Sequence, residues 1–218
     1  MTEPVGTVLF DLDGTLLDTA PDLGAALNRL LADMGRAPLP LEQIRPHVSH
    51  GARALLRLGL GLEPGDPGYD DHRARLLDHY VNDIATHSRL FPGMEQVLEH
   101  MAAHGITWGV VTNKPGWLTG PLMDALDLTR HAACIVSGDT TAHPKPHPAP
   151  LLHACRTAGT PPARCLFVGD AERDLVAGRA AGIPTLVALF GYIDAGESPH
   201  TWGADGYLEG PLDLLRWL

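Results

Sequence analysis

Cysteine and aromatic residues are scarce in this chain of 218 residues: it has three cysteines, and 6% of its residues are Phe, Trp or Tyr. Cys134, Cys155 and Cys165 have no spacing typical of metal ligands, and an odd number of thiols cannot pair completely in disulfides. Their sequence neighbours are mostly apolar. We therefore expect buried, reduced thiols, as are typical of a cytoplasmic protein.

A surplus of positive charge is also missing, because 16 Lys and Arg stand against 26 Asp and Glu, a formal net charge of -10. This argues against a protein that binds the phosphate backbone of nucleic acid. No apolar run approaches the ~20 residues that span a bilayer, so we expect no membrane partner. The stretch Met1–Pro4 lacks the basic and apolar regions of a secretory signal.

The chain does contain 44% hydrophobic residues, and its length is ample for a sizeable core. From residue 91 onward, short apolar runs alternate with segments of helical periodicity, which indicates a parallel sheet covered by helices on both faces. The apolar run Val8–Phe10 has no alternation and therefore predicts a buried parallel strand. The other predicted strands are 106–113, 134–136, 165–168 and 185–189.

Residues 16–87 have helical patterns and no strand pattern. The first strand must belong to the sheet that follows, because alone it could not be buried. We therefore predict an α/β core domain formed by residues 1–15 and 88–218, with a helical domain, residues 16–87, inserted after the first strand.

Two aspartates, Asp11 and Asp13, follow the first strand, and Gly14 permits the unusual backbone angles that end it. Side chains two residues apart on extended backbone point the same way, so both carboxylates can face one ligand. Ligands of open α/β sheets bind at the carboxyl ends of strands, and Mg²⁺ is the simplest partner for two such carboxylates. The alternative is that the pair caps a turn or the next helix.

Three more polar groups lie at or just beyond the ends of predicted strands. Thr112 and Asn113 offer a hydroxyl and backbone N–H groups to a phosphoryl oxygen, although an ordinary helix cap has the same residues. Lys145 lies among three prolines that stiffen the backbone and can aim its ammonium inward, or simply form a rigid surface loop. Asp170 and Asp174 are one helical turn apart and can face one crevice, or be favourable acids at a helix N-terminus.

His143 and His147 flank Lys145 and are four residues apart. The intervening prolines argue against a helix that would bring the two imidazoles together. We therefore expect no metal site at this pair.

In chain order, the motifs Asp-x-Asp-Gly-Thr, strand-Thr-Asn, Lys-Pro and Gly-Asp-x-x-x-Asp resemble the haloacid dehalogenase superfamily of phosphatases. The resemblance covers the whole chain and implies a Rossmann-like parallel sheet core with an inserted helical-bundle cap. Stretches 10–19 and 111–115 are similar to the phosphoglycolate phosphatase group. Stretches 48–53, 87–91, 191–193 and 202–205 look like its proteobacterial branch, whose members include N-acetylmuramic acid 6-phosphate phosphatases. Ala171 departs from the pattern, because many relatives have serine there.

The resemblance implies phosphomonoester hydrolysis through an aspartyl-phosphate. Asp11 would be the nucleophile, and Asp13 would protonate the leaving alcohol and then activate water. Thr112, the Asn113 backbone and Lys145 would bind the phosphoryl group and stabilise its charge, which makes Thr112 and Lys145 catalytic as well.

The resemblance also implies a Mg²⁺ cofactor. The Asp11 carboxylate, the backbone carbonyl of Asp13 and the Asp170 carboxylate would be its protein ligands. Asp174 would bind the metal through water or orient the other ligands.

Substrate selection would lie with the helical cap, which closes over the crevice. Ser49, His50 and Arg53 are the candidate contacts, since Gly51 lets the backbone approach closely; the alternative for Arg53 is a solvated helix residue. The expected substrate is a small phosphorylated metabolite, of phosphoglycolate type or N-acetylmuramic acid 6-phosphate. The sequence determines neither that choice nor the oligomeric state.

Three other functions share part of the pattern. A dehalogenase of the same fold needs neither Asp13 nor a metal, so the second aspartate and the Gly-Asp-x-x-x-Asp segment count against it. A sugar phosphomutase shares all four motifs and differs only in returning the phosphoryl group to its substrate. A phospho-receiver signalling module also phosphorylates an aspartate in an α/β sheet, but it does not need a helical insertion.

Overall fold

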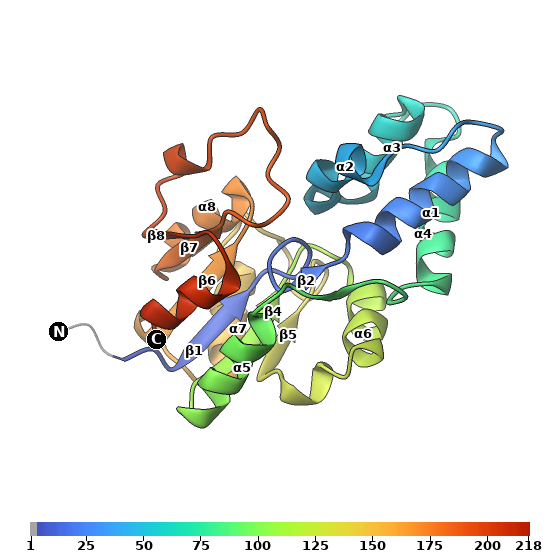
Figure 1. Ribbon diagram of the computed structural model, residues 1–218. Coiled ribbons are helices and arrows are strands. Elements are labelled where there is room, and N and C mark those ends of the chain that lie inside the picture. Colours follow the sequence, from blue (N-terminus) through green and yellow to red (C-terminus); the bar gives the residue numbers. More distant parts are fainter. Residues whose placement is uncertain (1–3) are drawn as a thin grey trace.

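The computed structural model describes residues 4–218 (Figure 1). Met1–Glu3, on which the expectation about a secretory signal partly rests, lie outside the described residues. Between residues 4 and 218, every helix is too short or too polar to cross a membrane.

A six-stranded parallel sheet forms the core, with the strand order β5-β4-β1-β6-β7-β8. All four residues of β1 are buried, as a central strand covered on both faces requires. The strands are β1 Thr7–Phe10, β4 Thr107–Val111, β5 Cys134–Val136, β6 Cys165–Gly169, β7 Thr185–Ala188 and β8 Gly206–Leu208. The predicted α/β fold class is confirmed, although β8 was missed because Gly-Tyr-Leu has no apolar run like that of the equally short β5.

Helices cover both faces of this sheet. They are α5 Met94–Ala103, α6 Gly116–Ala125, α7 Ala149–Ala158 and α8 Glu172–Ala181. Val8 and Phe10 pack with residues of α5 and α6, whereas Leu9 packs with residues of α7 and α8, so alternate residues of β1 serve opposite faces. The three cysteines are free and lie buried in the second of these clusters.

The segment between β1 and α5 forms a separate helical group beyond the carboxyl end of β1 (Figure 1). It contains α1 Ala20–Asp33, α2 Leu41–Ile44, a 3₁₀ helix at Arg45–His50, α3 Gly51–Leu60 and α4 Tyr69–Asn82. Its apolar residues form their own core, in which leucines of α1 pack against α3 and α4. We call this group the cap helices; its boundaries at residues 16 and 87 stay a prediction.

Two short strands join the cap helices to the sheet. β2 Leu17–Asp18 pairs antiparallel with β3 Arg89–Leu90, so the expectation that residues 16–87 contain no strand is wrong at this point. A two-residue strand has no hydrophobic period, and it forms here because the leaving and returning chain segments run side by side. The buried Asp22 carboxylate accepts hydrogen bonds from the Ser88 backbone N–H (2.7 Å) and hydroxyl (2.7 Å), which ties the returning segment to α1.

Candidate active site

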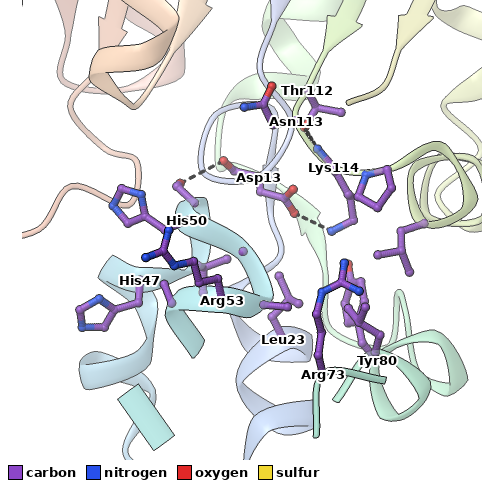
Figure 2. A pocket seen from close by; sticks show the side chains of 18 of the residues that line it. Asp13, Leu23, His47, His50, Arg53, Arg73, Tyr80, Thr112, Asn113 and Lys114 are labelled. Atoms are coloured by element: carbon purple, nitrogen blue, oxygen red, sulfur yellow. Dashed lines mark hydrogen bonds and ion pairs between the residues drawn. The ribbon is translucent and has the colours of Figure 1, made fainter. Parts of the chain in front are cut away.

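A cavity of about 1080 Å³ lies between the carboxyl ends of the strands and the cap helices (Figure 2). The core contributes Asp11 and Asp13 after β1 and Thr112–Pro115 after β4. The cap contributes residues of α1, α3, α4 and the 3₁₀ helix, including all three predicted contacts: Ser49, His50 and Arg53. The strand-end clusters and the cap candidates therefore meet at one place.

Three carboxylates gather beside this cavity, and one of them, Asp11, lines it. Asp11 follows β1, Asp170 follows the neighbouring strand β6, and Asp174 lies in the first turn of α8. All three side chains are buried, and one oxygen atom from each lies within 4.8 Å of the others. Neighbouring parallel strands end at the same edge of a sheet, which is why residues so distant in sequence come together.

Lys145 lies among these carboxylates. Its Nζ is 3.0 Å from Asp11 Oδ1 and 2.7 Å from Asp174 Oδ1, and its side chain is fully buried. The Asn113 side chain holds the lysine's backbone at two points, accepting from its N–H (2.9 Å) and donating to its carbonyl (2.8 Å). The side chain of Asn113 thus orients the Lys145 loop, a contact that sequence reasoning missed.

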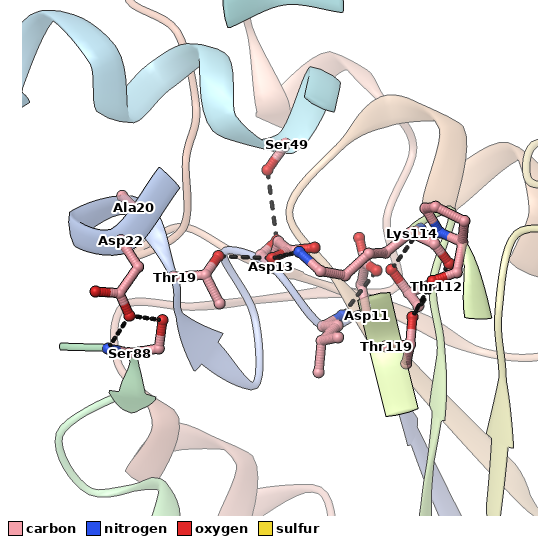
Figure 3. Close-up of polar contacts among 12 residues, drawn as sticks. Asp11, Asp13, Thr19, Ala20, Asp22, Ser49, Ser88, Thr112, Lys114 and Thr119 are labelled. Carbon is pink, nitrogen blue, oxygen red and sulfur yellow. Dashed lines mark hydrogen bonds and ion pairs between the residues drawn. The ribbon is translucent and has the colours of Figure 1, made fainter. Parts of the chain in front are cut away.

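Asp13 makes contacts different from those of Asp11 (Figure 3). Its Oδ1 accepts a hydrogen bond from the Thr19 hydroxyl (2.6 Å) and is 3.0 Å from the Nζ of Lys114. The regular strand ends at Phe10, so the two-residue alternation that predicted parallel side chains no longer applies at residues 11–13. The side chain of Asp13 is therefore absent from the carboxylate cluster.

Lys114 is the most important site residue that sequence reasoning left without a role. Its side chain is almost completely buried, and its Nζ lies 4.6 Å from the centre of the Tyr80 ring on α4. Burial alone would lower the pKa of Lys114, but the Asp13 carboxylate and Tyr80 outweigh it, and the pKa is raised. Lys114 thus stays charged and connects Asp13 to a cap helix. Its position directly after Thr112-Asn113 was the only available signal.

The Asp170 carboxylate has the chemistry of a cation ligand. Burial, together with the charges of Asp11 and Asp174, raises its pKa to about 7. Its Oδ2 accepts from the Ser49 hydroxyl (2.7 Å) and the Tyr192 N–H (2.9 Å), whereas its buried Oδ1 has no hydrogen-bond partner within residues 4–218. Gly14 has a φ of 85°, and a Cβ there would overlap this carboxylate. Clustered carboxylates with an unsatisfied oxygen fit a hard divalent cation.

The other predicted residues vary in their contacts. The Thr112 hydroxyl accepts from the Lys114 backbone N–H (3.1 Å) at the cavity wall. Ser49 contacts Asp170 across the cap–core boundary, which makes it a neighbour of the carboxylate cluster. Arg53 is exposed and forms an ion pair with Glu63 (2.9 Å). Burial lowers the pKa of His50, so its ring is neutral near pH 7.

His143 and His147 lie together, with ring centres 4.7 Å apart. Residues 143–147 form no helix, as the prolines predict, but a turn closed by the His147 N–H and the Pro144 carbonyl (3.0 Å) brings the two rings together. In the described part of the chain, the pair belongs to no group of three or more metal-ligating side chains.

Known proteins share both this sequence pattern and this fold. The family described as haloacid dehalogenase-like hydrolase matches residues 8–188. An N-acetylmuramic acid 6-phosphate phosphatase from Pseudomonas putida is 42% identical over 96% of this chain and 94% of its own length. A phosphoglycolate phosphatase from Xylella fastidiosa is 43% identical over 96% of this chain and 91% of its own. The crystal structure of a predicted phosphoglycolate phosphatase from Haemophilus somnus superposes with a TM-score of 0.85 at 26% identity, covering 98% of this chain and 97% of that one.

Proposed function

This chain belongs to the haloacid dehalogenase-like hydrolase family and is a phosphatase, and we propose that it hydrolyses a small phosphorylated metabolite through an aspartyl-phosphate on Asp11. The observation that carries the proposal is the contact of Asp11 with the buried Lys145, which keeps a carboxylate of the cavity wall beside a fixed positive charge. A nucleophile in such a position splits a difficult hydrolysis into two easier steps.

In the first step, an Asp11 oxygen forms a bond to phosphorus while the bond from phosphorus to the alcohol oxygen breaks. Asp13 donates a proton to that departing oxygen. In the second step, Asp13 takes a proton from water as the water oxygen attacks phosphorus and frees Asp11. Thr112, the Asn113 backbone N–H and Lys145 bind the phosphoryl oxygens and stabilise their charge in both steps.

The proposed metal ligands are Asp11, the Asp13 backbone carbonyl and Asp170, with Asp174 as a further or orienting ligand. The unsatisfied Asp170 oxygen and the closeness of three carboxylates support a Mg²⁺ ion here. When bound, Mg²⁺ supplies positive charge that offsets the carboxylates and polarises the phosphoryl group.

Mg²⁺ is expected to stabilise the protein more at about pH 8 than at about pH 5.5. Without metal, burial and the neighbouring carboxylates raise the pKa of Asp170 in the folded protein to about 7, above its ordinary value of 3.8. The folded protein therefore holds an extra proton between these values, and its stability falls as the pH rises through this window. Mg²⁺ requires the deprotonated carboxylate, so it competes with protons at the lower pH. The measurement is the shift in unfolding temperature caused by Mg²⁺ at each pH.

Asp170→Asn provides the control for this measurement. The substitution removes the titrating group and a ligand, so the Mg²⁺-induced shift should nearly vanish at both pH values. Equal Mg²⁺-induced shifts at the two pH values in the unsubstituted protein would contradict the assignment of Asp170.

The size of the cavity bears on the choice between the two substrates named for the relatives. Cavities that enclose drug-sized ligands have volumes of about 300–1,000 Å³. Phosphoglycolate is far smaller than such a ligand, whereas N-acetylmuramic acid 6-phosphate carries a whole substituted sugar. A cavity of about 1080 Å³ therefore favours the sugar phosphate over a substrate of phosphoglycolate type.

A Mg²⁺-dependent phosphate-release assay with both compounds and p-nitrophenyl phosphate tests the proposal. We expect turnover of all three, with kcat/KM higher by about tenfold or more for N-acetylmuramic acid 6-phosphate than for phosphoglycolate. The reverse order would overturn the argument from cavity size. No release from any of them would overturn the phosphatase proposal, and an isomerised sugar phosphate among the products would favour a mutase.

A further inference from the structure

The cap wall of the cavity is basic, although the chain as a whole has a net charge of -10. Arg53, Arg57 and Arg73 of the cap helices line it. Among the described lining residues, the only acidic ones are Asp11 and Asp13, and both belong to the core side. A cleft lined by one sign of charge concentrates ligands of the opposite sign. The cap arginines therefore create a positive potential that attracts an anion to a position separate from Lys145.

Arg73 differs from Arg53 and Arg57, because these two arginines form ion pairs with Glu63. Arg73 shares one face of α4 with Tyr69, Leu77 and Tyr80, which also line the cavity at helical spacing. Figure 2 shows the side chain rising from α4 into the cavity. The Arg73 side chain is exposed, and it forms no hydrogen bond or ion pair with any other residue of the described range 4–218. By contrast, Arg75 on the same helix is paired with Asp33 at 3.0 Å.

Arg53 and Arg57 already hold one carboxylate. They are one turn apart on α3, and their Nε atoms lie 2.9 Å and 3.4 Å from the two oxygens of Glu63. Exposed ion pairs of this kind contribute little to stability. A carboxylate or phosphate on a ligand can therefore share or replace Glu63 as the partner of these guanidinium groups, whose fork geometry suits both anions.

We propose that Arg73, with Arg53 and Arg57 on the neighbouring helix, binds a second anionic group of the substrate, remote from the phosphoryl group transferred to Asp11. This inference rests on the proposed phosphatase function. It defines the substrate class as a phosphomonoester whose other end carries a carboxylate or a second phosphate. Arg73 is a specificity residue in this scheme and takes no part in the chemical steps.

The test compares pairs of substrates in which one member carries a second anionic group and the other does not. N-acetylmuramic acid 6-phosphate carries a lactyl carboxylate that N-acetylglucosamine 6-phosphate lacks, and fructose 1,6-bisphosphate carries a phosphate that fructose 6-phosphate lacks. Arg73→Gln should lower kcat/KM about 10- to 100-fold for the member of the preferred pair that carries the second anionic group, mainly through KM. For the partner substrate and for p-nitrophenyl phosphate, the change should stay below about threefold. The pair that responds identifies the anion as carboxylate or phosphate.

Arg75→Gln is the matched control, because Arg75 lies on the same helix and does not line the cavity. Arg75→Gln should leave kcat/KM unchanged for both members of each substrate pair. Arg73→Lys should recover part of the loss, since it restores the charge without the fork. Equal losses on both members of each pair, or no loss on either, would overturn the proposal. A failure of the phosphatase function would look different, because the unsubstituted protein would then release no phosphate from p-nitrophenyl phosphate.

Discussion

Asp11→Asn is expected to lower Mg²⁺-dependent phosphate release by roughly 10⁴-fold or more, for p-nitrophenyl phosphate as well as for sugar phosphates. An amide of the same shape cannot form the aspartyl-phosphate, and within residues 4–218 no other carboxylate both contacts Lys145 and lines the cavity. Asp174 also contacts Lys145, but it does not line the cavity. A rate near that of the unsubstituted enzyme would rule out Asp11 as the nucleophile.

The fold should survive this substitution. Asp11 is one of the two charges that raise the pKa of Asp170, so its neutralisation relieves repulsion in the buried cluster. Lys145 keeps Asp174 as a partner. We therefore expect a metal-free unfolding temperature equal to or above that of the unsubstituted protein. Asp33→Asn, which changes an exposed aspartate on α1 outside the cavity, should retain full activity and serves as the control.

The carboxylate cluster could be predicted because it depends on short-range patterns and one general rule. Apolar runs identify β1 and β6, and each is followed by an aspartate, Asp11 or Asp170. The rule that parallel strands end at the same edge then brings the two residues together without knowledge of any side-chain contact. The position of Lys145 could not be predicted from local sequence alone. Three prolines indicate a stiff loop, but they do not determine the direction in which the loop points. Asn113, 32 residues earlier, fixes that direction.

The contacts between cap and core could not be predicted in this way. Lys114 lies against α4, with its Nζ 4.6 Å from the centre of the Tyr80 ring, and Ser49 reaches Asp170 across 121 residues of sequence. Such contacts depend on the position of the cap helices relative to the strand ends. The hydrophobic periodicity of the sequence contains no information about that position. Arg73 illustrates the same limit: helical spacing places it on one face of α4, but only the packed structure says that this face lines the cavity. Likewise, β2 and β3 exist because two linkers are adjacent in space.

Asp13→Asn is expected to separate the two chemical steps. Loss of a general acid and base lowers turnover about 10²- to 10⁴-fold for a sugar phosphate, whose alkoxide must be protonated as it leaves. p-Nitrophenolate leaves without a proton, so the first step should remain fast with p-nitrophenyl phosphate, whereas attack by water on the aspartyl-phosphate lacks its base. Stopped-flow absorbance should therefore show a burst of about one p-nitrophenolate per active site, followed by slow release.

The contacts of Asp13 decide which control this experiment needs. Asp13→Asn leaves the ammonium of Lys114 almost fully buried without its carboxylate, and an uncompensated buried charge destabilises a fold. A lower unfolding temperature is thus expected for Asp13→Asn alone. The double variant Asp13→Asn, Lys114→Gln removes both charges and should regain stability while keeping the burst and the slow second phase. A linear time course without a burst in both variants would mean that Asp13 does not act on water, and that another group provides the base.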